Sequence, residues 1–223
     1  MREVFQAELK SIGDELIQMS TLVAEAMERA YASFETADTD IAQEVIAADQ
    51  RIDYLQNSLD ERAIDVLALQ GPVASDLRMI VGSLRMSASL ERMGDLARHI
   101  AQLTRLRYPA QVAPARLVDT FKEMARLDIE IAHKVTQLLE TRDLTIASEI
   151  IALNTSVDKL HASVFRAVAE AEWAESAPVT ADATLTSRYF ERYADHGVSV
   201  ARKVNYLVTG EWDPELSAAL DQD

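Results

Sequence analysis

Acidic residues occur twice in this sequence at a spacing that suits metal binding. The run ERMGD begins at Glu91 and ends at Asp95, and 100 positions later the run ERYAD begins at Glu191 and ends at Asp195. Residues four apart lie on the same face of an α-helix, so each run directs two carboxylates to one side. Paired carboxylates are ligands that hard cations such as Mg²⁺, Mn²⁺, Ca²⁺ and iron accept, with Zn²⁺ as a further candidate.

An internal repeat surrounds the two runs. The stretch from Met19 to Leu55 is similar to the stretch from Met124 to Leu160 at an offset of 105 positions, and the segments that hold the two runs match at an offset of 100. Self-similarity over this length indicates two copies of one structural unit, joined here by the proline-flanked residues 109–114. The acidic runs are therefore equivalent positions of two similar units.

The repeat also identifies a second pair of oxygen-bearing side chains in each copy. Asp49 and Asp53 are four residues apart, and their counterparts in the second copy are Asn154 and Asp158. Each aspartate of the first copy follows an apolar residue of a helical stripe by one position, which is about 100° around a helix. These side chains should therefore lie at the edge of a buried seam, neither fully buried nor freely solvated.

Long helices must position these residues. Six glycines and five prolines are few for 223 residues, and the apolar residues recur at helical spacing, which favours helices over sheets. The sequence predicts an all-α fold of two tandem, similar three-helix bundles, with short breaks at Gly71-Pro72 and Ala177-Pro178. The predicted helices are 2–36, 40–70, 73–107, 115–141, 144–174 and 182–209. The predicted domains are a first bundle at 1–108, a second bundle at 115–210 and a short C-terminal tail at 211–223.

The hairpins predict that both acidic pairs of a copy lie at the same height. Asp53 precedes Gly71 by 18 residues and Glu91 follows it by 20, so antiparallel helices place the two side chains nearly level. The second hairpin does the same for Asp158 and Glu191. Like charges gathered in this way repel and raise one another's pKa unless a cation lies between them.

Arginines on the same helices offer a structural alternative to metal binding. They could neutralise the acids in ordinary ion pairs, with no metal involved. These residues are Arg85, Arg92, Arg98, Arg188, Arg192 and Arg202. The spacing of the acids alone leaves both interpretations open, because it does not say which side chains reach across from one helix to the next.

Composition restricts the class of partner and the compartment. The net charge of −15 argues against binding to nucleic acid or to anionic membranes, whose phosphates need clustered Lys and Arg. With no cysteine, the chain has neither disulfides nor thiolate chemistry. Acids near the N-terminus and the lack of a long apolar run predict a cytoplasmic protein that meets a membrane only through its partners.

These motifs resemble those of PhoU, a family of bacterial regulators of phosphate uptake. The resemblance rests on ERMGD and ERYADH, on the Asp49–Asp53 pair and on Asp76-Leu-Arg78 at the start of the third predicted helix, and it covers nearly the whole chain. In this family, paired acidic motifs on adjacent helices of each bundle hold a small metal cluster at the bundle surface. The resemblance implies sites for Fe, Zn, Mg or Mn ions at two groups of residues, namely Asp49, Asp53, Glu91 and Asp95, and Asp158, Glu191 and Asp195.

The sequence departs from the family pattern at two places. Asn154 stands where the family often has a carboxylate, which predicts weaker metal binding in the second site. The family motif usually continues to an Asn four residues after its Asp, but these positions hold His99 and Ser199 here. His99 could bind a metal through its imidazole, although a single His at a helix edge is more often a simple polar contact.

The resemblance implies a regulatory role without catalysis. The implied role is to lower the phosphate-starvation response when phosphate is plentiful, by linking the ATPase of the phosphate ABC importer to a membrane-bound sensor histidine kinase. By the same resemblance the protein is expected to form a homodimer. A helical scaffold that binds no metal is the alternative within the class of binding proteins.

A helical di-iron carboxylate enzyme is a competing interpretation. Such enzymes place a Glu-x-x-His motif on each of two helices. The chain offers Glu130-x-x-His133 and, more loosely, Asp158-x-x-His161 on adjacent predicted helices. The first copy has Glu28 in the position of His133, so the motif is not repeated there. We therefore treat the enzyme as the weaker alternative.

Overall fold

The structure, a computed structural model, describes residues 2–211 and confirms the all-α fold predicted from the sequence. Within that range the chain forms six long α-helices, and a single turn of 3-10 helix precedes the fourth. The elements are α1 (Arg2–Thr36), α2 (Thr39–Gln70), α3 (Ala74–Arg107), η1 (Ala115–Leu117), α4 (Val118–Thr141), α5 (Leu144–Ala169) and α6 (Ala177–Thr209). The predicted tail at 211–223 lies, apart from Glu211, outside the described residues.

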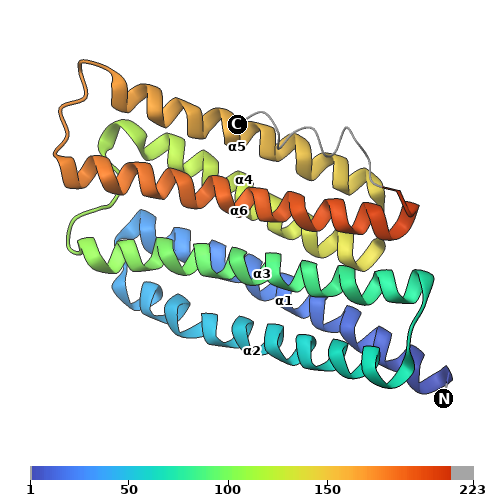
Figure 1. The fold of residues 1–223 in the computed structure, drawn as a ribbon. Helices are drawn as coiled ribbons and strands as arrows, with labels where there is room; N and C mark the ends of the chain where they lie inside the picture. The colour runs from blue at the N-terminus through green and yellow to red at the C-terminus, as the bar shows by residue number, and fades with distance from the viewer. Residues whose placement is uncertain (1, 212–223) are drawn as a thin grey trace.

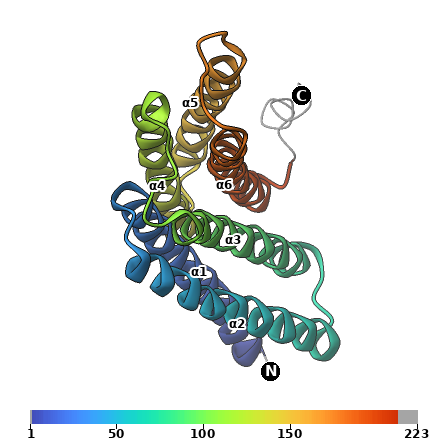
Figure 2. The same cartoon turned by 90° about the vertical axis from the view of Figure 1, so that its left-hand side faces the viewer.

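The six helices form two tandem three-helix bundles that lie against each other. The first bundle contains α1, α2 and α3, and the second contains α4, α5 and α6, as Figure 1 shows. Between the bundles, α3 contacts α6 and α1 contacts α4, so that α2 and α5 lie on the outer sides (Figure 2). The helices that carry the ERMGD and ERYAD runs, α3 and α6, are therefore neighbours at the centre of the molecule.

Local sequence signals explain where several helices begin and end. The side chain of Asp38 accepts hydrogen bonds from the backbone N–H groups of Asp40 (2.9 Å) and Ile41 (3.0 Å) and caps the start of α2. Asp143 caps the start of α5 in the same way. Gly71 ends α2 in a left-handed conformation (φ 54°), which glycine adopts without strain. The second helix of each bundle is therefore capped by an aspartate, and the two aspartates occupy equivalent positions of the repeat.

The connection between α5 and α6 differs from the prediction. The fifth helix ends five residues earlier than predicted, at Ala169, and the sixth begins five residues earlier, at Ala177. Pro178 starts the last helix instead of interrupting the chain, because the first turn of a helix does not need the N–H that proline lacks. The indole N–H of Trp173 donates a hydrogen bond to Thr180 Oγ1 (2.8 Å), which holds the intervening loop against α6.

The helices α3 and α6 run antiparallel, and the two ends of their contact differ. At one end the guanidinium of Arg107 forms an ion pair with the carboxylate of Asp182. At the other end the side chain of Leu207 lies against Gly82, where an added Cβ would be 3.1 Å from a leucine methyl carbon. These residues are repeat counterparts, since Gly82 and Asp182, and Arg107 and Leu207, are each 100 positions apart. The duplicated fold is therefore not symmetric in its contacts.

Apolar side chains from both bundles form one continuous core. At the crossing of α3, α4 and α6, an added Cβ on Gly197 would lie 2.5 Å from a methyl carbon of Ile131 and 3.8 Å from the methyl carbon of Met93. Only a residue without a side chain lets the three helices meet this closely. Across residues 2–211, no helix is both long enough and apolar enough to cross a membrane.

Candidate metal-binding clusters

The first acidic cluster joins two helices that approach each other closely. We define it as Asp49, Asp53, Glu91 and Asp95. An added Cβ on Gly94 would lie 2.9 Å from Ile52 Cδ1 and 3.2 Å from Asp49 Oδ1, so side chains of α2 pack directly against the backbone of α3 here. The charge of Asp53 on α2 contributes to the raised pKa of Glu91 on α3. The acids that were predicted to lie level are therefore neighbours across the two helices.

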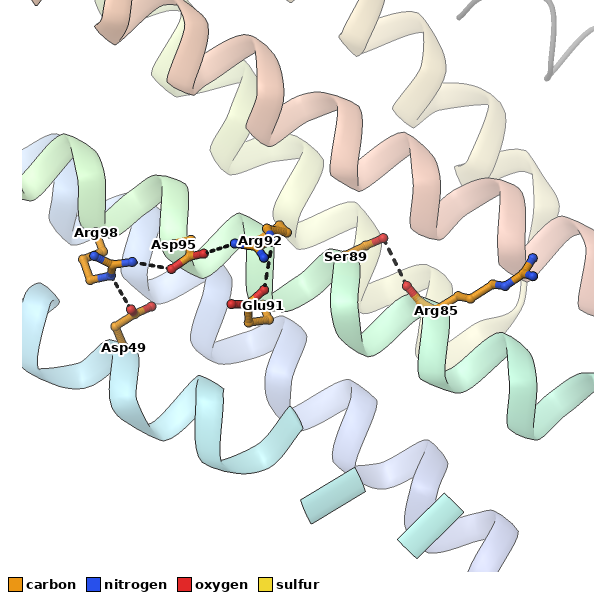
Figure 3. A network of polar contacts seen from close by, with 7 residues as sticks. All are labelled: Asp49, Arg85, Ser89, Glu91, Arg92, Asp95 and Arg98. Carbon is orange, nitrogen blue, oxygen red and sulfur yellow. Dashed lines mark hydrogen bonds and ion pairs between the residues drawn. The ribbon is translucent and has the colours of Figure 1, made fainter. Parts of the chain in front are cut away.

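Arginine side chains lie between the acids of the first cluster. The guanidinium of Arg98 donates hydrogen bonds to the carboxylates of both Asp49 and Asp95, and so connects α2 with α3 (Figure 3). Arg92 donates to Asp95 at 2.6 Å and lies 3.4 Å from Glu91. In this cluster the acids are thus neutralised, at least in part, by arginine, which is the structural alternative that the sequence offered.

Burial and arginine act in opposite directions on the ionisation of this cluster. Burial, followed by the neighbouring charge of Asp95, raises the pKa of Glu91 to about 7. Burial also disfavours the ionised form of Asp95, but hydrogen bonds and charge from Arg98 outweigh it and lower the pKa below the ordinary value. For Asp49 burial exceeds the effect of Arg98, and its pKa stays raised. Arg98 therefore acts as the internal counter-charge of the first cluster.

The second acidic cluster consists of Asp158 on α5 and Glu191 and Asp195 on α6. One oxygen atom from each of the three carboxylates can be chosen so that all three atoms lie within 4.8 Å of one another. In the part of the chain that the structure describes, no other group of three His, Asp or Glu residues has this geometry. Glu191 is only 5% exposed. Three carboxylates converge here as the ligands of a cation do.

Two further side chains contact the second cluster. Asn154 Nδ2 donates to Asp158 Oδ2 at 3.3 Å, while the Oδ1 atom of the same amide is buried without a hydrogen-bond partner. Arg188 donates to both carboxylate oxygens of Glu191 at 2.7 Å. Its side chain is 50% exposed, and the ion pair stays within α6 because the two residues are three positions apart. The amide of Asn154, in contrast, comes from α5.

Burial dominates the ionisation of the second cluster. Burial, followed by the charge of Asp195, raises the pKa of Glu191 to about 7. The pKa of Asp195 is also raised, again chiefly by burial. Burial, with the charge of Arg192, lowers the pKa of the adjacent His196 to about 4, so this imidazole is neutral and supplies no positive charge. A cation held among these carboxylates would favour their ionised forms.

The residues of the second cluster fit a hard metal cation. Three convergent carboxylates and an amide oxygen without a partner are ligands of the kind that Mg²⁺, Mn²⁺ and iron accept. Buried oxygen atoms that lack a hydrogen-bond partner are costly unless another group satisfies them. In the first cluster Arg98 bridges the acids of the two helices, so the fit is poorer there.

Asp128 on α4 lies beside the second cluster and was not identified from the sequence. Its side chain is completely buried, and neither carboxylate oxygen has a hydrogen-bond partner within the described structure. Burial raises its pKa well above the ordinary value, and the charges of Glu191 and Asp195 raise it further. A signal was available, since Asp128 occupies a position in the apolar stripe of its helix and is the counterpart of Val23.

The residues that replace the family's Asn have contacts of their own. The ring of His99 packs against Tyr189 of α6, with ring centroids 5.2 Å apart. Burial, followed by the charge of Arg98, lowers the pKa of His99. Ser199 donates to the backbone carbonyl of Asp195 at 3.0 Å. Metal binding by His99 stays a prediction.

The main motif of the competing di-iron interpretation has other partners. Glu130 forms an ion pair with Arg126 at 3.0 Å, and His133 Nε2 lies 2.7 Å from Glu28 Oε1. Neither Glu130 nor His133 belongs to a group of residues with metal-binding geometry in the range 2–211. The geometry of Glu130 and His133 therefore gives no support to a di-iron site at this motif.

The fold and the duplicated acidic clusters define a protein built from two copies of one three-helix module. The PhoU domain, as a family model, matches the chain twice, at residues 16–104 and 121–204. The chain therefore belongs to the PhoU family, which its sequence motifs had indicated.

Relatives of known description agree with this assignment. The chain is 36% identical over 210 residues to phosphate-specific transport system accessory protein PhoU homolog 2 of Mycobacterium tuberculosis, covering 94% of this chain and 99% of the relative. It is 27% identical over 208 residues to the corresponding PhoU homolog of Rhizobium meliloti, covering 92% of this chain and 87% of that relative. Both names describe accessory proteins of phosphate-specific transport systems.

Two solved structures have the same fold. The crystal structure of PhoU from Pseudomonas aeruginosa superimposes with a TM-score of 0.84 at 25% identity, covering 93% of this chain and 100% of that chain. The phosphate transport system regulatory protein PhoU from Streptococcus pneumoniae superimposes with a TM-score of 0.83 at 23% identity, covering 94% and 99%. The likeness extends over both bundles.

Proposed function

We propose that this protein is a negative regulator of the phosphate-starvation response that bridges a phosphate ABC importer and a sensor histidine kinase. Its relatives are named accessory proteins of phosphate-specific transport systems, and the match spans 99% of the Mycobacterium tuberculosis relative. A role in the regulation of phosphate transport is the coarser part of the proposal. The bridge between the importer ATPase and the kinase is the finer part.

The observation that carries the proposal is the two-bundle body of the protein. The outer helices α2 and α5 lie on opposite sides, so each bundle has an outward face of its own (Figure 2). The net charge of −15 suits such faces to basic patches on other proteins. A body with two similar outward faces can contact two different partners at once, which is what a bridge requires. Homodimer formation stays a prediction.

Within this role we assign cation binding to the acidic clusters, and first of all to the second cluster, which fits a cation better, with Fe, Zn, Mg or Mn as the candidate ions. The carboxylates would hold the ion at the surface of the bundle, where it orders the side chains around it. The role proposed for the clusters is to bind the ion, and it includes no reaction.

Complementation tests the regulatory role. A bacterial strain that lacks its own PhoU protein should express a reporter from a phosphate-starvation promoter even in phosphate-rich medium. This chain should repress that reporter, whereas an empty vector should not. Continued expression of the reporter, in cells where an immunoblot shows normal amounts of the folded protein, would contradict the regulatory role.

Co-purification separates the bridge from the coarser role. The tagged chain, crosslinked in phosphate-rich cells, should recover both the importer ATPase and the kinase, identified by mass spectrometry. Recovery of only one of them from cells in which the reporter is properly repressed would refute the bridge and leave the regulatory role standing.

A further inference from the structure

Besides Asp49 and Asn154, two further pairs of counterpart positions at the acidic clusters differ in charge. Arg98 of the first copy corresponds to Val198 of the second, 100 positions later, and Val23 of the first copy corresponds to Asp128 of the second, 105 positions later. The first copy therefore has a positive side chain where the second has an apolar one. The second copy has a negative side chain where the first has an apolar one. Both differences act on the charge of a cluster.

Arg98 links the two helices that supply the first cluster. Its guanidinium donates to Asp49 on α2 and to Asp95 on α3, whose side chains are 8% and 14% exposed. A guanidinium held between two carboxylates satisfies the charge and the hydrogen bonds that a metal ion would otherwise satisfy. A metal entering the first cluster has to displace this group and tolerate its positive charge nearby.

The second cluster has an apolar residue in place of the bridging arginine. Val198 carries no charge, and Arg188 pairs with Glu191 on its own helix. Asn154 reaches Asp158 with its amide N–H, but the Oδ1 atom of that amide is buried without a hydrogen-bond partner. An amide can turn its oxygen toward a cation, whereas a guanidinium has no acceptor to offer. The second cluster can therefore accept a cation without expelling a positive group from between its helices.

Asp128 adds a buried carboxylate beneath the second cluster. It is fully buried, has no hydrogen-bond partner on either oxygen, and lies within electrostatic range of Glu191 and Asp195. One turn further along α4, Ile131 packs against Gly197 of α6, so this face of α4 is turned toward α6. A buried carboxyl group with no partner is costly, and although Asp128 is not among the three converging ligands, the positive charge of a cation bound by them would stabilise its ionised form.

We propose that this chain binds its cation in the second bundle, where Asp128 compensates for the carboxylate that Asn154 lacks, and that Arg98 closes the first bundle to metal. This inference rests on the metal-binding part of the proposed function. It reverses the order of affinity expected from Asn154 alone, which predicted the weaker site in the second bundle.

Titration of the metal-free protein with Mn²⁺ locates the site. Isothermal calorimetry gives the affinity, and the EPR signal of free Mn²⁺ gives the number of ions bound. The double substitution Glu191→Gln/Asp195→Asn should abolish the tight binding, and the matched change Glu91→Gln/Asp95→Asn should leave it unaltered. Asp128→Asn, which keeps the shape of the side chain, should weaken Mn²⁺ binding by about 10- to 100-fold.

Arg98→Val tests the closure of the first bundle, because it installs the residue found at the counterpart position. This variant should bind additional Mn²⁺, and the additional site should disappear when Glu91→Gln/Asp95→Asn is combined with it. Circular dichroism and thermal melting in EDTA establish that each variant is folded. If Asp128→Asn does not fold, Arg98→Val and the two acid pairs still decide between the bundles.

Three results would overturn the inference. They are equal losses of Mn²⁺ binding from the two acid pairs, an unchanged affinity in folded Asp128→Asn, and no additional site in Arg98→Val. A wild-type protein that binds no Mn²⁺, Fe or Zn in either bundle would refute the metal assignment as a whole. The regulatory role is judged separately by the reporter, so its failure cannot be confused with that of the metal site.

Discussion

The phenol of Tyr193 on α6 donates a hydrogen bond of 3.1 Å to the backbone carbonyl of Val23 on α1, and so joins the two bundles at the centre of the molecule. Tyr193 is completely buried. Burial, followed by the charge of Asp128, raises the pKa of this phenol well above its ordinary value. The hydroxyl therefore stays protonated and remains a donor throughout the usual pH range.

Tyr193→Phe should lower the free energy of unfolding by about 0.5–1.5 kcal/mol, because the hydrogen bond is lost while the ring still packs. Urea denaturation measures the change. The matched control is Tyr54→Phe, since the side chain of Tyr54 is 70% exposed and its hydroxyl is solvated. If the two substitutions have the same effect, the bond between the bundles contributes nothing to stability.

Gly94→Ala should destabilise the protein by about 1–3 kcal/mol, because the new methyl group overpacks the contact between α2 and α3. The added Cβ would lie 2.9 Å from Ile52 Cδ1 and 3.2 Å from Asp49 Oδ1. Gly13 on α1 is the control, since no atom lies within 4 Å of an added Cβ there. Gly13→Ala should stabilise the helix by roughly 0.5–1 kcal/mol. Thermal melts of both variants provide the comparison, and a neutral Gly94→Ala would show that the helices can separate freely.

Glu191 should make the metal-free protein less stable as the pH rises. Burial raises its pKa in the folded protein from 4.5 to about 7, so the folded state holds the proton more tightly than the unfolded state does. This contribution is fully present below the unfolded pKa and is lost as the pH rises through the folded pKa. Glu191→Gln removes the titration. Its stability relative to the wild type, measured in urea with EDTA, should therefore increase between about pH 5 and about pH 8. A constant difference over that range would contradict the raised pKa.

Asp38→Ala should cost about 1 kcal/mol of stability, because the first backbone N–H groups of α2 lose their acceptor. Asp38→Asn keeps an acceptor oxygen and should cost much less. Chemical denaturation of the wild type and the two variants distinguishes the effect of the capping hydrogen bonds from the effect of the negative charge. Equal losses in the two variants would mean that the negative charge, rather than the hydrogen bonds to Asp40 and Ile41, is what stabilises the helix start.

Much of the fold could be predicted because it depends on local signals. The turn at Gly71 and the cap at Asp38 act within a few residues, and the apolar stripes define which face of each helix is buried. The α5–α6 connection was predicted less well, because Pro178 can either interrupt a helix or begin one. The hydrogen bond from Trp173 to Thr180 favours a helix that begins at this proline, and the local sequence does not predict that hydrogen bond.

The acidic clusters could be predicted only in part. The spacing of the acids and the internal repeat were enough to locate Glu91, Glu191 and the other acids of the two clusters, because residues four apart share one face of any helix. The bridge made by Arg98 depends on which rotamer crosses to α2, which the spacing of residues does not determine. Asp128 was missed for a different reason. A single acid inside an apolar stripe does not indicate a site until the residues around it are known.

The contact between α3 and α6 has an ion pair, Arg107–Asp182, at one end and an apolar step, Gly82–Leu207, at the other. If the two similar halves made identical contacts, the two ends of the contact between α3 and α6 would be equivalent. The ion pair at one end and the apolar contact at the other make the two ends different. A partner that recognised the charged end would therefore find no equivalent site at the apolar end.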